Sequence, residues 1–127
     1  MNDRFEQLYQ LSENLYIEDA PIIILAGSLL KDKVSGCVVA QIKYQSLSEK
    51  TIKALKLDIM PMDVSGQELG DVIEYQYLDL NVRTGQDFGS NKAIVIQNIV
   101  ARSFRIVDIT VVFDDGEKWF NDGQQNH

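Results

Sequence analysis

The residues that do most covalent and metal chemistry in proteins are nearly absent from this sequence. It holds one cysteine, Cys37, and one histidine, His127, which is the last residue. A Ser-His-Asp or Cys-His arrangement needs a base beside its nucleophile, and a structural zinc site needs about four Cys or His ligands. There is also no Walker sequence and no GxGxxG run. The sequence therefore predicts a protein that is not an enzyme, with no catalytic residue, no metal site and no cofactor.

Two acidic segments offer oxygen ligands instead. Asp114, Asp115 and Glu117 surround Gly116, and a second acidic segment starts at Asp63. Oxygen-rich loops can hold Ca²⁺, although neither segment has the spacing of an EF-hand. Asp also favours turns, because its carboxylate accepts hydrogen bonds from nearby backbone amides. Both segments are typical of solvated turns, and Asp114 and Asp115 remain candidates for a ligand or partner surface.

The aromatic candidates are Trp119, Phe120, Tyr75 and Tyr77. Exposed on one sheet face, such rings form a platform that stacks on a sugar or docks a peptide. The alternative is that they pack into the core, which is the usual place of a single Trp near a strand end. Tyr75 and Tyr77 point the same way if their segment is a strand, so they share one environment. We take Trp119, Tyr75 and Tyr77 as candidate surface residues.

Charge and length limit the class of protein further. Lys and Arg number 12 against 19 Asp and Glu, which gives a net charge of −7 and a pI near 4.6. A nucleic-acid backbone binder needs a basic face, so no nucleic-acid partner is expected. The longest apolar run, residues 22–27, is too short to span a membrane, and the N-terminal residues lack the pattern of a secretory signal. We expect a cytoplasmic protein with a reduced thiol, folded as one domain of 127 residues.

The elements that position these residues are mostly strands. The chain has 11 Val and 13 Ile against 6 Ala, a balance that favours pleated sheet over helix. From Pro21 onward, apolar residues alternate with polar ones in segments separated by turn residues, which predicts about seven strands. Within residues 102–113 the alternation changes phase, so we expect a β-bulge there or a strand that moves between two sheets. Residues 4–12 are the exception: Phe5, Leu8 and Tyr9 form a helical stripe with Ser12, which predicts a short helix docked on the sheets.

Several segments resemble a known family. They are the strand Ala40-Gln41-Ile42-Lys43-Tyr44, the turn Met62-Asp63-Val64-Ser65-Gly66 and the late Val112-Phe113-Asp114-Asp115-Gly116. Across residues 21–120 the chain resembles the small immunoglobulin-like β-sandwich domains of uncharacterised bacterial proteins, similar to FxLYD-type domains. Met62 stands where those domains carry an aromatic residue. The resemblance implies a fold and an accessory or interaction role, and it brings no catalytic residues.

Together these observations predict an all-β protein: an antiparallel, two-sheet, immunoglobulin-like sandwich of about seven strands. Residues 1–20 are expected to form the N-terminal helix and linker, residues 21–120 the sandwich, and residues 121–127 a flexible tail. The predicted function is a non-catalytic interaction or scaffold module that binds a protein or itself, as a homodimer through a sheet edge or the N-terminal helix. The alternative is a ligand-binding module for carbohydrate or calcium. Membrane insertion is not expected.

Overall fold

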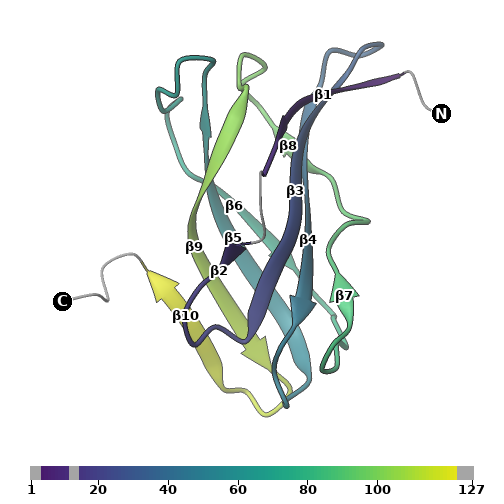
Figure 1. The fold of residues 1–127 in the computed structure, drawn as a ribbon, viewed down its shortest axis with the longest axis vertical. Helices are drawn as coiled ribbons and strands as arrows, with labels where there is room; N and C mark the ends of the chain where they lie inside the picture. Colours follow the sequence, from purple (N-terminus) through teal and green to yellow (C-terminus); the bar gives the residue numbers. More distant parts are fainter. Residues whose placement is uncertain (1–3, 12–14, 123–127) are drawn as a thin grey trace.

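The computed structural model describes residues 4–11 and 15–122, and every regular element in these ranges is a β-strand. The strands form two antiparallel sheets that face each other around one core (Figure 1). This agrees with the sequence prediction of an all-β, two-sheet protein. The ten strands are β1 (Phe5–Gln10), β2 (Leu15–Tyr16), β3 (Ile22–Asp32), β4 (Val38–Ser46), β5 (Ile52–Met62), β6 (Ile73–Tyr77), β7 (Asp87–Phe88), β8 (Ile94–Ile96), β9 (Ser103–Phe113) and β10 (Lys118–Asp122).

The two sheets differ in how regular their edges are. The six-stranded sheet has the order β1-β3-β4-β7, with β2 also paired to β3 and β8 also paired to β4. The four-stranded sheet has the order β10-β9-β5-β6. In Figure 1 the β9–β10 hairpin, in green and yellow, forms one side of the molecule, with β10 outermost. The four-stranded sheet thus ends in two five-residue strands, β10 and β6.

The core follows from the two-residue alternation of the long strands. On β5, Leu55, Leu57 and Ile59 are fully buried, whereas Lys56 and Asp58 lie on the outer face. The opposite sheet contributes its own buried row, so large aliphatic side chains from both sheets meet in the interior. The fully buried large side chains are Tyr44, Ile22, Ile24, Leu29, Ile42, Ile52, Leu55, Leu57, Ile59, Ile94, Ile96 and Ile109.

The prediction of an N-terminal helix is wrong. Residues 5–10 form β1, which pairs antiparallel with β3, and Ser12 lies outside the described residues. A helix of about nine residues is marginal in water, whereas the free edge of β3 offers a row of backbone partners. A register shift between Gln7 and Tyr9 leaves both Leu8 and Tyr9 half-buried, which reproduces part of the helical stripe. The Tyr9 ring meets Phe104 of the other sheet edge-on, with ring centroids 5.4 Å apart.

Gly27 explains how the chain after β1 comes so close to β3. The Leu11 amide donates to the Gly27 carbonyl at 2.9 Å, and a Cβ on Gly27 would lie 2.7 Å from the Leu11 side chain. The apolar run of residues 22–30, with Gly27 inside it, predicts either a strand buried on both faces or one that bends at Gly27 to serve two sheets. In the structure β3 stays in one sheet, with its register shift between Ile24 and Ala26.

The phase change in β9 is the predicted bulge. Asp58 pairs with Asp108 and Ile59 with Ile106, so Val107 is the additional residue. The bulge keeps side chains on both sides of it directed to the core. The predicted turns are present as well: Asp63 accepts hydrogen bonds from the amides of Ser65 (2.9 Å) and Gln67 (3.0 Å).

Candidate functional site

The tyrosines predicted as a surface lie largely inside the sandwich. Tyr77 is 2% exposed, and its ring meets that of Tyr44, on the opposite sheet, at 5.3 Å and 85°. The Tyr44 hydroxyl donates to the Tyr77 hydroxyl at 3.2 Å. Burial raises the pKa of Tyr77 to about 12 and that of Tyr44 well above its usual value. Tyr75 is half-buried and packs edge-on against Tyr77 at 4.8 Å. These rings hold the two sheets together and do not form a stacking platform.

The two aromatic residues of β10 point to opposite faces. Trp119 pairs with the buried Val111 of β9, lies on the inner side and is half-buried against the core. Phe120 pairs with Thr110, lies on the outer side and is 50% exposed. The structure therefore does not bring Trp119, Tyr75 and Tyr77 together as one exposed face, and the exposed ring at this edge belongs to Phe120.

In the acidic turn between β9 and β10, Asp115 stabilises the turn through an ion pair and a hydrogen bond. Its carboxylate lies 2.9 Å from the Lys50 ammonium and accepts a hydrogen bond from the Glu117 amide at 2.9 Å. These contacts hold the pKa of Asp115 below its usual value. Asp114 is exposed, and its amide donates to the Thr51 carbonyl. Within residues 4–11 and 15–122 no three acidic, Cys or His side chains lie together as a metal site.

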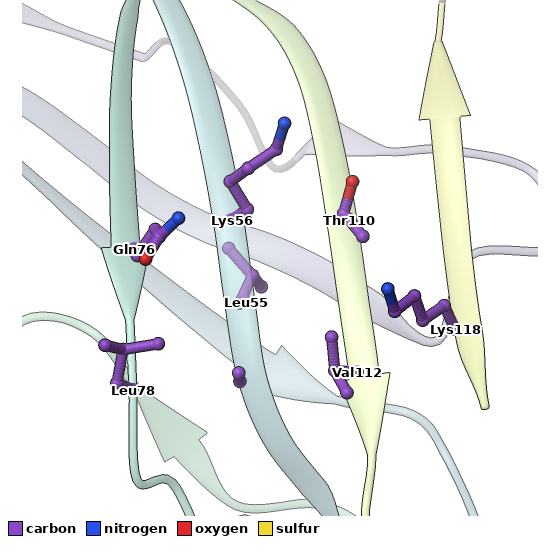
Figure 2. A pocket seen from close by; sticks show the side chains of 8 residues that line it. Leu55, Lys56, Gln76, Leu78, Thr110, Val112 and Lys118 are labelled. Carbon is purple, nitrogen blue, oxygen red and sulfur yellow. The ribbon is translucent and has the colours of Figure 1, made fainter. Parts of the chain in front are cut away.

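The outer face of the four-stranded sheet carries an open depression of about 340 Å³ (Figure 2). The small residues Ala54 and Thr110 form part of it, on the adjacent strands β5 and β9. Leu78, which is 60% exposed, and Val112 add apolar walls on either side. We call this depression the trough. Its complete lining is Ala54, Leu55, Lys56, Gln76, Leu78, Thr110, Val112 and Lys118.

Charges around the trough are separated by sign. Lys56 and Lys118 line it, as Figure 2 shows. One row further along the sheet, Glu74, Asp58 and Asp108 occupy adjacent positions on β6, β5 and β9, because Asp58 pairs with both acidic residues. We call these three residues the acidic row. Like charges directly opposite each other in a sheet destabilise it, so the row is a cost to the fold.

Asp58 lies at the centre of the acidic row and has the least favourable environment for a charged carboxylate. Its Oδ1 atom is buried and accepts no hydrogen bond from the described residues, while its other oxygen lies 3.8 Å from the Lys56 ammonium. Burial raises the pKa of Asp58, and the neighbouring Asp108 and Glu74 raise it further, whereas Lys56 opposes them. Lys56 also lies 3.8 Å from Glu74 and thus partly balances two members of the row.

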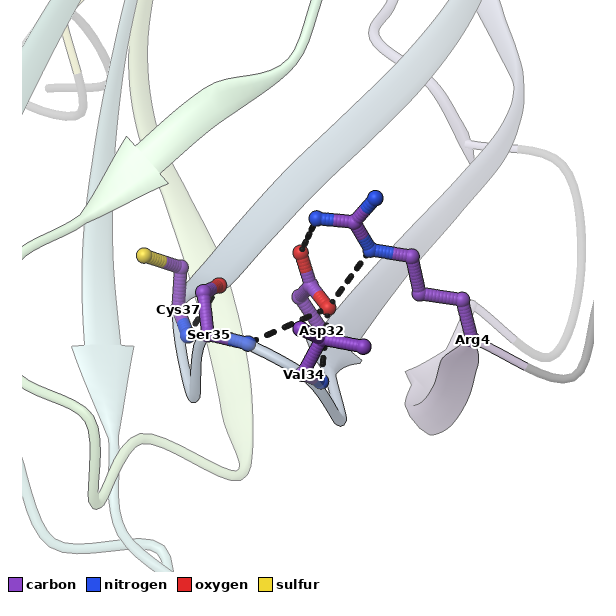
Figure 3. A network of polar contacts seen from close by, with 5 residues as sticks. All are labelled: Arg4, Asp32, Val34, Ser35 and Cys37. Atoms are coloured by element: carbon purple, nitrogen blue, oxygen red, sulfur yellow. Dashed lines mark hydrogen bonds and ion pairs between the residues drawn. The ribbon is translucent and has the colours of Figure 1, made fainter.

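A second polar network closes the turn between β3 and β4 (Figure 3). The Arg4 guanidinium holds the Asp32 carboxylate at 2.9 Å and 2.8 Å, and Asp32 also accepts from the Val34 amide at 2.9 Å. The Arg4 hydrogen bond is the main cause that holds the pKa of Asp32 far below its usual value. Cys37 follows on the surface, where its amide donates to the Ser35 hydroxyl. The network ties β1 to the β3–β4 turn.

The trough and the acidic row are the features that sequence reasoning missed. Each strand's alternation shows which of its residues point outward. It does not show that residues 54, 78 and 112, or 58, 74 and 108, come together, because those contacts depend on the register between strands far apart in the chain.

A scan against protein-family models found no match, and searches of curated proteins and of solved structures found none either. The resemblance to FxLYD-type domains therefore stays a prediction from the sequence. No helix that could cross a lipid bilayer occurs in the part of the chain that the structure describes.

Proposed function

We propose that this chain is a non-catalytic, immunoglobulin-like interaction module that binds an extended segment of a protein partner across the outer face of its four-stranded sheet. The observation that carries the proposal is the trough, an apolar depression that the fold leaves open while its aromatic rings are mostly turned inward. An exposed apolar depression with a few polar groups at its rim suits recognition of a side chain.

The charges around the trough indicate the chemistry of the partner. An aliphatic side chain would fill the space between Leu78 and Val112. A carboxylate beside it would meet Lys118, and a basic residue at the other end of the segment would meet the acidic row. Glu74 is the exposed carboxylate of the row and would meet that basic group, while Asp58 and Asp108 add negative charge beside it. Complementary charge would fix the direction of the bound segment and favour its association.

A displayed library of random twelve-residue peptides tests this proposal. Selection on the wild-type protein should enrich peptides in which an aliphatic residue lies between an acidic and a basic one. Those peptides should lose at least about tenfold in affinity for Leu78→Asp and Ala54→Arg, which place a charge in the trough or fill it. Val64→Asp is the matched control, because Val64 is 89% exposed on the β5–β6 connection and does not line the trough.

Two outcomes would contradict the proposal. One is the absence of any enriched peptide. The other is enrichment of peptides that bind the wild type, Leu78→Asp and Ala54→Arg equally well, because such peptides would use another surface. Thermal unfolding of each variant shows that the protein used in the selection is folded.

A further inference from the structure

The sheet edges differ in their ability to accept another strand. In the six-stranded sheet, β2, β7 and β8 have two or three residues each, and β1 has an irregular register. Short and bulged edges are poor templates for another chain. In the four-stranded sheet, β10 pairs with β9 over five residues without any irregularity. Its other side pairs with no strand among the described residues, so β10 is a free and regular edge.

The hairpin shows which backbone groups of β10 face that free edge. The Phe113 amide donates to the Glu117 carbonyl at 2.9 Å, so these two residues form a hydrogen-bonded pair. Hydrogen-bonded and non-hydrogen-bonded pairs alternate along an antiparallel ladder. Trp119 and Asn121 therefore bond to β9, whereas Lys118, Phe120 and Asp122 direct their N–H and C=O groups to the free edge.

The sequence of β10 is complementary to itself in this geometry. An antiparallel pair centred on Phe120 places Phe120 opposite the same residue of a second copy, and Lys118 opposite the acidic Asp122. This register uses all three outward-directed residues on each side, and shifts of two residues use fewer. It also places the two half-exposed Phe120 rings on the same face, where cross-strand aromatic pairs stabilise a sheet.

We propose that a second copy of this chain pairs with β10 through this register, forming one continuous eight-stranded sheet across a twofold axis. The other five-residue edge is a worse site, because β6 carries Glu74 and no basic residue that could pair with it across a twofold axis. The twofold axis stands perpendicular to the sheet, so the two troughs lie on the same side of the dimer. The dimer does not rest on the proposed function, although it would present two binding faces together.

A contact of about five residues on each side is at the low end of specific interfaces, so we expect a dissociation constant on the order of 100 µM. Sedimentation velocity of the full chain, from about 10 µM to about 1 mM, should show a monomer that becomes a dimer. Hydrogen exchange at the two ends of that range should slow at the amides of Lys118, Phe120 and Asp122 only in the concentrated sample.

A charge exchange tests the register. Lys118→Asp alone and Asp122→Lys alone should each lower the dimer fraction at least about tenfold, because each places like charges opposite each other. An equimolar mixture of the two variants should restore the dimer as a heterodimer. Phe120→Pro should also abolish it, since this substitution removes an amide that faces the free edge and no hydrogen bond to β9.

Leu78→Asp separates this inference from the proposed function, because it alters the trough and leaves β10 unchanged; it should dimerise like the wild type. A wild type that stays monomeric at about 1 mM overturns the inference. So does a mixture of the charge variants that fails to associate more than either variant alone. If Phe120→Pro fails to fold, the charge exchange still decides.

Discussion

Removing one hydroxyl from the buried Tyr44–Tyr77 pair should cost about as much as removing both. The two hydroxyls lie 3.2 Å apart between the sheets, and the two residues are 0% and 2% exposed. Tyr77→Phe leaves the Tyr44 hydroxyl in the core without its partner. Tyr44→Phe does the same to the Tyr77 hydroxyl. The double variant leaves neither hydroxyl behind and keeps both rings.

The magnitudes follow from the cost of a buried polar group without a hydrogen bond, which is about 1–3 kcal/mol. We expect each single variant to lose about 2 kcal/mol of unfolding free energy, and the double variant to lose about the same amount and not the sum. The coupling energy between the two sites is then about 2 kcal/mol. For a domain of 127 residues, each kcal/mol corresponds to about 4 °C in Tm, so the single variants should melt about 8 °C lower.

Urea denaturation of the four proteins, followed by fluorescence and circular dichroism, measures this cycle. Equal slopes of unfolding free energy against urea would show that all four unfold to the same extent. Phe88, which stacks on Tyr44 at 5.0 Å, stays unchanged in every protein of the cycle. Losses that simply add in the double variant would refute the reasoning, because they would show that the two hydroxyls do not depend on each other.

Three further predictions concern the same regions. The free energy of unfolding should fall as the pH rises from 10 to about 12, because tyrosines of the unfolded chain ionise near 10.0 while Tyr77 in the folded protein keeps its proton to about 12. This difference in pKa lowers the free energy of unfolding by an amount on the order of 2–3 kcal/mol. Unfolding titrations at alkaline pH should show a weaker fall for the Tyr44→Phe/Tyr77→Phe protein. Asp58→Asn should stabilise the fold at pH 7 by up to about 1 kcal/mol, because it removes a carboxylate whose raised pKa makes its charged form unfavourable in the folded state. That gain should vanish below pH 3.8, where the carboxyl is protonated in both states, and a gain that is constant with pH in urea titrations would contradict the assignment. Gly89→Ala should lower the free energy of unfolding by about 2 kcal/mol or more, because Gly89 has φ 97° and a Cβ would lie 2.6 Å from the Tyr44 ring. The control is Gly85→Ala, since Gly85 has φ 83° and a Cβ there would meet nothing within 4 Å. In the same denaturation assay it should lose about 1 kcal/mol.

The acidic residues have different effects according to what surrounds them. The Asp32 carboxylate accepts hydrogen bonds from Arg4 and from backbone amides, which lower its pKa. Its charge therefore stabilises the β3–β4 turn above pH 3.8. Asp58 faces Asp108 and Glu74 with one oxygen unbonded, so its charge opposes folding. A feature that costs stability on an exposed face is consistent with a role in binding, because complementary charges of a partner would relieve it.

The fold class and most of the local structure can be predicted from the order of the amino acids. Alternating Ile and Val residues identified the long strands β4, β5 and β9, because side chains of a strand point alternately to its two faces. The bulge in β9 and the turns at Asp63 and Gly116 could also be predicted, since a phase change and Asp-Gly turn chemistry are local signals. The apolar residues at 75, 77, 78, 80 and 82 predict one extended segment, but β6 ends at Tyr77, and Asp79 just beyond it adopts φ 56°.

The environments of the candidate residues depend on contacts that form only when the two sheets come together. Residues 5–10 became a strand because β3 offered an edge, which no local pattern reveals. Tyr77 became buried because Tyr44 of the opposite sheet lies against it, and Phe120 became the exposed ring of β10 because Trp119 turns inward. Of the predicted tail, Asn121 and Asp122 belong to β10, and residues 123–127 lie outside the described residues. The trough and the acidic row arise from the register of four strands, and register depends on contacts between distant parts of the chain, which a one-dimensional pattern does not contain.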